Sequence, residues 1–283
     1  NWLFKYKMKI LDTHHHLWNL SLRKYDWIND LPKKEANAIN KNFLINDLNI
    51  VANNNNLDGT ICVQAHQSED EAFWLLEIAK NSELIKGVVC WVDLKSPSLE
   101  SSLDNYLLNE KFVGIRHVWH DEKEEDWIMD PKVISGLKIL SDREINFDFL
   151  VRPNHLKYIF EVYEKVPSLK GVIDHIAKPF IKNNIFEPWA AEMSELSKID
   201  NLYCKISGIV EEMDDTQELS IINNYTNHII DNFGFNKIMY GSNWPVCLTK
   251  KSYSEVLEIA EDVIPSPALE NFFYSNGEKF YLS

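Results

Sequence analysis

The residues best suited to chemistry are three consecutive histidines, His14, His15 and His16, which directly follow a short apolar run near the start of the chain. Side chains alternate along an extended strand, so His14 and His16 are expected to share one side while His15 points away. Two imidazoles facing one small volume suit a divalent cation, for which neutral histidine is a common ligand. The two imidazoles could equally well form hydrogen bonds to a substrate carbonyl.

Another histidine, His175, follows a second short apolar run in the segment Ile173-Asp174-His175. If both runs end at the same edge of a sheet, His175 could join His14 and His16 and complete a metal site. Three histidines with an open position for water are typical of zinc, so zinc is the expected ion, and a site without metal is the alternative. Taken alone, His175 also fits a histidine that is hydrogen-bonded within a polar loop.

A small-residue turn, Gly241-Ser242-Asn243-Trp244-Pro245, places Asn243 where a proton acceptor would be useful, although an amide is essentially non-basic. Arginine can hold a carboxylate through two hydrogen bonds, and lysine can stabilise an oxyanion, or either can form a structural ion pair. Polar candidates for binding an oxygen-rich ligand are Gln64, His66, Arg116, His117 and Lys205. Aromatic candidates for stacking on a sugar, or for forming the walls of a pocket, are Trp18, Trp27 and Trp244.

These residues follow short β-rich runs that alternate with helical patterns, which predicts parallel strands joined by helices. The expected strands are 9–12, 60–64, 87–92, 113–116, 146–151, 171–173, 202–205 and 237–240. The spacing of Phe73, Leu76 and Ala79 predicts a helix after the second strand, and residues 53–56 read as a short polar loop. Eight such units favour one α/β domain over residues 1–283, a closed (β/α)₈ TIM barrel, with an open doubly wound sheet as the alternative. In a barrel, the active site lies at the carboxyl ends of the strands.

The charge and cysteine content of the chain limit the classes of molecule it is expected to bind and the compartment it is expected to occupy. The 283 residues carry a formal charge of -14, with 43 acidic and 29 basic side chains, which disfavours binding to nucleic acid or to an anionic membrane. The four cysteines stand singly in apolar runs and are expected to be reduced and buried. Residues 1–7 lack the long apolar core of a signal peptide, so a cytoplasmic location is expected.

Taken in order along the chain, the motifs resemble one branch of the amidohydrolase superfamily, the sugar-acid lactonases and 2-pyrone-4,6-dicarboxylate lactonase. The motifs are Asp12-Thr13-His14-His15-His16-Leu17-Trp18, Val63-Gln64-Ala65, Gly114-Ile115-Arg116-His117, Ile173-Asp174-His175, Cys204-Lys205-Ile206-Ser207-Gly208 and Gly241-Ser242-Asn243-Trp244-Pro245. They run from the first strand to the eighth. The resemblance therefore covers nearly the whole chain and also implies a TIM barrel.

The resemblance implies a hydrolase that opens a small sugar-acid lactone, of the L-fucono- or L-rhamnono-lactone type, by attack of water on the ester carbonyl. It assigns metal binding or polarisation of the carbonyl to His14, His16 and His175, and a position facing the substrate to Arg116. Lys205 stands where dinuclear relatives have another histidine, which argues against two metal ions. The implied partner is a small lactone or sugar acid, and the oligomeric state is left open.

Position 243 departs from the family pattern, in which the turn reads Gly-Ser-Asp-Trp-Pro and the aspartate is the general base. Asn243 cannot take that role, so a metal-bound hydroxide or neutral His175 is the expected substitute base. Two alternatives follow. One is a 2-pyrone-4,6-dicarboxylate-type lactonase, and the other is a barrel that binds sugar acids without turning them over.

Overall fold

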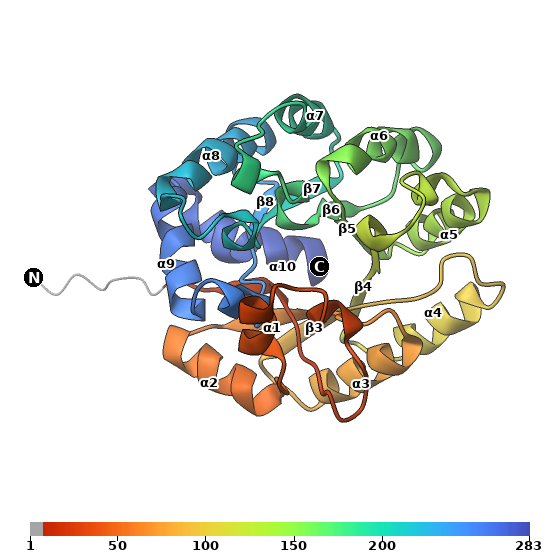
Figure 1. Ribbon diagram of the computed structural model, residues 1–283. Coiled ribbons are helices and arrows are strands. Elements are labelled where there is room, and N and C mark those ends of the chain that lie inside the picture. The colour runs from red at the N-terminus through yellow and green to blue at the C-terminus, as the bar shows by residue number, and fades with distance from the viewer. Residues whose placement is uncertain (1–7) are drawn as a thin grey trace, which may run out of the picture.

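The computed structural model describes residues 8–283, in which eight parallel strands form one sheet with the order β1 to β8. The helices lie outside the strands, around a central ring (Figure 1). The strands are β1 Leu11–His15, β2 Gly59–Val63, β3 Ile85–Cys90, β4 Phe112–Val118, β5 Asn146–Leu150, β6 Gly171–Ile173, β7 Leu202–Ile206 and β8 Ile238–Tyr240. The helices are α1 Lys33–Ile39, α2 Ile45–Asn55, α3 Glu69–Lys80, α4 Leu99–Leu107, α5 Pro131–Asp142, α6 Leu156–Lys165, α7 Trp189–Leu196, α8 Ile222–Phe233, α9 Tyr253–Val263 and α10 Asn276–Tyr281.

The ring is nearly closed between β8 and β1, and the contacts that join these strands lie just beyond β8. The amide of Asn243 donates to the carbonyl of His14 at 2.8 Å, and the amide of His16 donates to the carbonyl of Trp244 at 2.7 Å. The two strands belong to opposite ends of the chain. The fold is therefore the expected (β/α)₈ TIM barrel, and not an open sheet.

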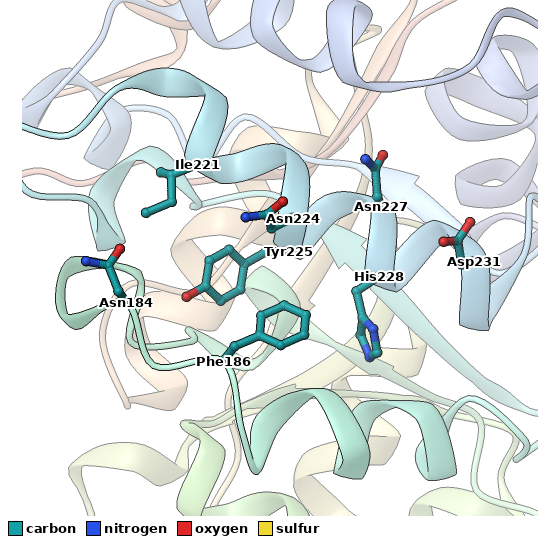
Figure 2. A pocket seen from close by; sticks show the side chains of 8 residues that line it. All are labelled: Asn184, Phe186, Ile221, Asn224, Tyr225, Asn227, His228 and Asp231. Atoms are coloured by element: carbon teal, nitrogen blue, oxygen red, sulfur yellow. The ribbon is translucent and has the colours of Figure 1, made fainter.

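A groove of about 470 Å³ lies on the outer side of the barrel, between α8 and the segment that leads into α7 (Figure 2). Phe186 packs edge-on against Tyr225 and His228, with ring centroids 5.3 and 5.4 Å apart. None of the histidines at the carboxyl ends of β1 and β6 lines this groove. It is separate from the site described below.

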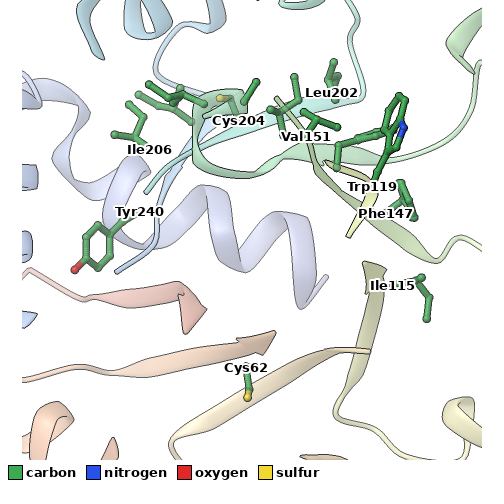
Figure 3. Packing of buried hydrophobic residues seen from close by; sticks show 14 of the residues in the cluster. Cys62, Ile115, Trp119, Phe147, Val151, Leu202, Cys204, Ile206 and Tyr240 are labelled. Atoms are coloured by element: carbon green, nitrogen blue, oxygen red, sulfur yellow. The ribbon is translucent and has the colours of Figure 1, made fainter. Parts of the chain in front are cut away.

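Alternate side chains of each strand pack on opposite faces, as the two-residue period of a strand requires. In β2, for example, Ile61 and Val63 belong to a small apolar cluster inside the barrel, whereas Cys62 belongs to the large cluster between strands and helices (Figure 3). Phe280 and Tyr281 of α10 join the inner cluster. The last helix therefore packs against the interior of the barrel.

Each of the eight expected strand runs overlaps an observed strand, but β1 extends to His15, so two of the histidines lie within the strand rather than after it. The helix expected after the second strand is α3, in which Leu76 and Ala79 are buried and Phe73 is 45% exposed. Residues 53–55 continue α2 instead of forming a loop, and Asn56 ends the helix in the left-handed conformation that asparagine tolerates.

All four cysteines are buried and unpaired, as expected. No helix within residues 8–283 has both the length and the apolar character needed to cross a bilayer. Residues 1–7, for which the sequence indicated no signal peptide, lie outside the described part of the chain.

Candidate active site

The end of β1 directs His14 and His16 into one cluster. Their rings lie 4.9 Å apart, whereas His15 bonds to Thr60 of β2 through Nε2 at 3.0 Å. The expected separation of His15 from its two neighbours is therefore confirmed. His16 Nδ1 lies 2.8 Å from the carbonyl oxygen of Val63, which can only accept, so this nitrogen carries the proton and Nε2 keeps its lone pair.

His175 reaches the same cluster from β6, with its ring 4.4 Å from that of His14. The backbone makes this possible through an uncommon conformation, because four consecutive residues, His175 to Lys178, have φ angles between 47° and 62°. Left-handed backbone costs about 1–2 kcal/mol for each residue with a side chain, so the surrounding structure must hold this turn in place. His175 Nδ1 lies 2.8 Å from Ser207 Oγ, just after β7.

Gly208 leaves the space that His175 occupies. A Cβ atom built on Gly208 would lie 2.6 Å from His175 Nδ1, and the φ angle of this glycine is +58°. Both the close approach and the left-handed backbone require a residue without a side chain. The run Lys205-Ile206-Ser207-Gly208 therefore supplies a hydrogen-bond partner for His175 and the space beside it.

A buried charge network lies behind the histidines. Lys205 Nζ is 2.6 Å from Asp148 Oδ2 and 3.1 Å from Asp174 Oδ1, and Arg116 Nη1 is 3.2 Å from Asp174 Oδ2. Arg116 also donates to the carbonyl oxygen of Gln64 at 2.6 Å. Because each carboxylate has a cationic partner, the network keeps two positive side chains fixed at the centre of the barrel.

Both ring nitrogens of His14 face this network. Nδ1 lies 3.2 Å from Lys205 Nζ, and Nε2 lies 3.2 Å from Arg116 Nη1. A neutral imidazole accepts at one nitrogen only, so only one of these two contacts can be a hydrogen bond.

The three histidines are neutral near pH 7. Burial holds the pKa of His14 well below its usual 6.5, and the neighbouring Lys205 and Arg116 lower it further. Burial lowers the pKa of His16 to about 3 and also holds that of His175 well below its usual range. The fixed positive charge of the cluster is therefore on Arg116 and Lys205, and the imidazoles contribute lone pairs and N–H groups.

Exposure separates the side chains that can meet a ligand from those behind them. Arg116, His16 and His175 are each 4% exposed and Asn243 is 5% exposed, whereas His14, Lys205 and Gln64 have no exposed surface. A ligand at the carboxyl end of the barrel would therefore meet the first four side chains. The other three would act on it through these neighbours.

Several aromatic and polar residues expected to bind substrate have other partners in the structure. Trp18 has no exposed surface and donates through Nε1 to the carbonyl of Lys41, and Trp244 is 2% exposed, with its ring packed edge-on against Phe43. Both indoles are buried, which fits the walls of a pocket, the alternative given above, better than stacking on a sugar.

The remaining expected binding residues, His117 of β4 and two loop residues, have partners outside the cluster. His117 stacks on Trp127 with ring centroids 3.8 Å apart, and its Nε2 lies 2.7 Å from Glu122. His66 bonds to a serine two residues later, and Trp27 donates to the carbonyl oxygen of Ala65. These three are therefore not part of the histidine cluster.

Glu211, which the sequence reasoning did not select, lies beside Asn243. Asn243 Nδ2 donates to Glu211 Oε1 at 2.7 Å, and Oε2 of the same carboxyl is buried with no hydrogen-bond partner among the described residues. Burial raises the pKa of Glu211 to about 7, against the lowering effect of the Asn243 amide. The sequence held one indication of this residue, its position. Glu211 lies three residues after Gly208, the last residue of the β7 motif, and so close to the carboxyl end of a strand.

A possible metal site is formed by His14, Asp174 and His175, whose ligand atoms all lie within 4.8 Å of one another. Two histidines and a carboxylate fit zinc in type and spacing. This set contains Asp174 in addition to two of the three expected ligands, and it does not include His16, whose expected role as a ligand stays a prediction. Since each ring nitrogen of His14 lies 3.2 Å from a cationic side chain, an ion bound by His14 would have to replace one of those contacts.

The barrel, with its histidine cluster at the carboxyl ends of β1 and β6, defines an amidohydrolase-type site. A family model described as "Amidohydrolase" matches residues 11–282, and the chain belongs to this family.

Within this family, the chain is similar to two lactonases. The chain is 32% identical to an L-fucono-1,5-lactonase of Burkholderia ambifaria over 83% of this chain and 80% of that protein. It is 28% identical to an L-rhamnono-gamma-lactonase of Scheffersomyces stipitis over 59% of this chain and 58% of that protein. Among solved structures, an amidohydrolase from Burkholderia multivorans with bound zinc superposes with a TM-score of 0.89 at 26% identity, covering 96% of this chain and 99% of that one.

Proposed function

We propose that this protein hydrolyses a small sugar-acid lactone of the L-fucono- or L-rhamnono-lactone type. Its membership of the amidohydrolase family and its similarity to lactonases support this proposal. The proposed partner is a small lactone or sugar acid. A cytoplasmic location stays a prediction of the sequence.

The observation that carries the proposal is the cluster around His14, which Arg116 contacts at 3.2 Å and whose ring lies 4.9 and 4.4 Å from those of His16 and His175. Arg116, His16 and His175 each have a small exposed surface. A lactone carbonyl gains negative charge on its oxygen when water attacks. A fixed cation aimed at that oxygen stabilises the transition state more than the ground state. Arg116 would supply this charge, because burial keeps the imidazoles uncharged.

The imidazoles would orient the reactants. His16 carries its proton on Nδ1, so Nε2 can accept a hydrogen bond from a substrate hydroxyl or from the attacking water. Behind them, Asp174 holds Arg116, and Lys205 bonds to Asp148 and Asp174. Lys205 and the two aspartates are positioning residues in this scheme, since none of them has exposed surface.

We also propose that His14, Asp174 and His175 hold a divalent ion, with zinc the best match to the ligand types. When bound, such an ion would polarise the lactone carbonyl and lower the pKa of a coordinated water. The role given above to His16 does not depend on the ion, whereas an ion held by His14 would replace the contact of His14 with Arg116 or with Lys205.

A panel of aldonolactones tests the function. We expect the unaltered protein to release acid from L-fucono-1,5-lactone or L-rhamnono-1,4-lactone above the spontaneous rate, and Arg116→Met to lose most of this activity. Acid release no faster than in buffer, for every lactone of the panel, would overturn the proposal. Titration calorimetry on the same lactones then identifies a barrel that binds without turnover, because such a protein would show heat of binding and no acid.

A further inference from the structure

The proposed hydrolysis requires a group that takes a proton from water, and position 243 cannot supply it. The Asn243 side chain is an amide, and its Nδ2 is occupied in donating to Glu211 Oε1 at 2.7 Å. An amide in this arrangement has neither the basicity nor the free charge to accept a proton.

The other carboxylates near the cluster are already committed. Asp174 is shared by Arg116 and Lys205, and Asp148 accepts from Lys205 at 2.6 Å and from Tyr281 at 2.8 Å. Neither aspartate has any exposed surface. Neither is therefore placed to take a proton from a ligand at the mouth of the barrel.

Glu211 differs from these carboxylates because it forms no ion pair within residues 8–283, whereas Asp174 Oδ1, which also lacks a hydrogen bond, lies 3.1 Å from Lys205 Nζ. Glu211 lies in the short helical turn Val210–Glu212 after β7, where one oxygen accepts from Asn243 and the other is buried without a partner among residues 8–283. A buried carboxylate oxygen that has no donor is costly, and such groups commonly mark functional sites. Glu211 and Ser207 also line a small cavity of about 30 Å³, whose other walls are mostly apolar and include side chains of α8 and α9.

We infer that Glu211 is the general base of the proposed lactone hydrolysis, taking the role that an aspartate at position 243 would have, with Asn243 holding its carboxyl in place. This inference rests on the proposed function. The oxygen of water bonds to the lactone carbonyl carbon while one water proton passes to the Glu211 carboxylate. The ring C–O bond then breaks, and the same proton returns to the departing oxygen, so Glu211 ends unprotonated.

The electrostatic surroundings suit a base that works near neutral pH. Burial raises the pKa of Glu211 to about 7. The Asn243 amide, the backbone amide of Glu211 and the Lys178 ammonium lower its pKa, and the neighbouring Glu212 carboxylate raises it. Cys247, on the turn that follows β8, is close enough for its own pKa to be raised by Glu211. A proton acceptor with a pKa near the working pH combines availability with basicity.

The test compares four proteins on the best lactone of the panel: the unaltered chain, Glu211→Gln, Glu211→Asp and the matched control Glu212→Gln. Glutamine keeps the size of the side chain and the acceptor for Asn243 but cannot take a proton. We expect kcat to fall about a hundredfold or more in Glu211→Gln, with KM changed far less, and to fall less in Glu211→Asp. The control should stay within about twofold of the unaltered chain at pH 8, where Glu211 is charged in both proteins. Glu212 is paired with Lys178 and Arg152.

The pH profile and a double variant separate a base from a structural residue. The unaltered chain should lose kcat/KM as pH falls through about 7, and Glu211→Gln should lack this acidic limb. Asn243→Asp combined with Glu211→Gln should recover activity to within about tenfold, since it returns a carboxylate to the neighbouring position. Circular dichroism of each variant confirms that it is folded.

The outcomes are distinct. No turnover of any lactone by the unaltered chain overturns the proposed function and the base together. Turnover with an unchanged rate and pH profile in Glu211→Gln overturns the base and leaves the proposed function standing. A loss of activity that the Asn243→Asp change does not recover assigns Glu211 a purely structural role and also overturns the inference.

Discussion

The raised pKa of Glu211 predicts that removing its charge stabilises the protein at neutral and alkaline pH. The carboxyl would have a pKa of 4.5 in an ordinary environment, and burial raises it to about 7 in the folded protein. The folded state therefore holds this proton more tightly than the unfolded state. The stability that results is fully present below pH 4.5 and is lost as pH rises through about 7.

The size of the effect follows from the shift. One pKa unit corresponds to about 1.4 kcal/mol, so a rise from 4.5 to about 7 corresponds to about 3 kcal/mol. Glutamine does not titrate and keeps the bond from Asn243. We therefore expect Glu211→Gln to gain about 3 kcal/mol relative to the unaltered chain between about pH 4.5 and pH 8.

Urea unfolding of both proteins at several pH values measures this difference. The comparison is needed because burial also raises the pKa of Glu71 to about 7, which affects the pH dependence of both proteins equally. Glu212→Gln serves as the control for loss of one negative charge on the same turn. A stability difference between Glu211→Gln and the unaltered chain that stays constant with pH would refute the reasoning.

Three further predictions concern the cluster itself. Arg116→Lys should lower kcat/KM for the lactone by about 10²–10³-fold, because lysine cannot keep the fork of contacts to Gln64 and Asp174; an unchanged value in steady-state assays would contradict the role of Arg116. Lys205→Ala leaves two buried carboxylates without their nearest cation and should cost about 3–5 kcal/mol in urea unfolding. That loss should be larger at pH 8 than at pH 5, where the carboxylates can protonate, and a loss independent of pH would argue against the network. His175→Ala should retain less zinc than the unaltered chain when both are loaded, gel-filtered and subjected to elemental analysis, and equal zinc contents would place the ion elsewhere.

The strands of the fold could be predicted from the sequence because each strand is marked by a short local run of apolar residues. Parallel barrel strands are buried on both sides, and short apolar runs such as that of β7 therefore stand out between polar helical segments. Closure is not a local property. The amide of Asn243 and the carbonyl of His14 that join β8 to β1 belong to opposite ends of the chain, and no periodicity reveals their contact.

The site was accessible in part for the same reason. Alternation along β1 correctly grouped His14 with His16, because strand geometry fixes the direction of each side chain. It could not show the left-handed turn that directs His175, nor that the Asp174 carboxylate lies within 4.8 Å of the ligand atoms of His14 and His175.

The remaining errors also arose from tertiary packing. Trp18 looked available for stacking on a ligand, but its ring is covered by Phe43, which lies far from it in sequence. Glu211 was missed because its importance comes from one bond to Asn243 and one oxygen without a hydrogen-bond partner among residues 8–283, and its position shortly after β7 reveals neither.

The packing of α10 against the inside of the barrel has a consequence for how the protein is made. Tyr281 donates from this helix to Asp148, which in turn holds Lys205, so the charge network needs a residue that follows every strand in the chain. During synthesis, a chain that has just been extended to the end of β8 contains all the histidines of the cluster. It still lacks Tyr281, whose hydroxyl donates to Asp148 in the charge network. The charge network behind the histidines should therefore form fully only after α10 has packed against the inside of the barrel.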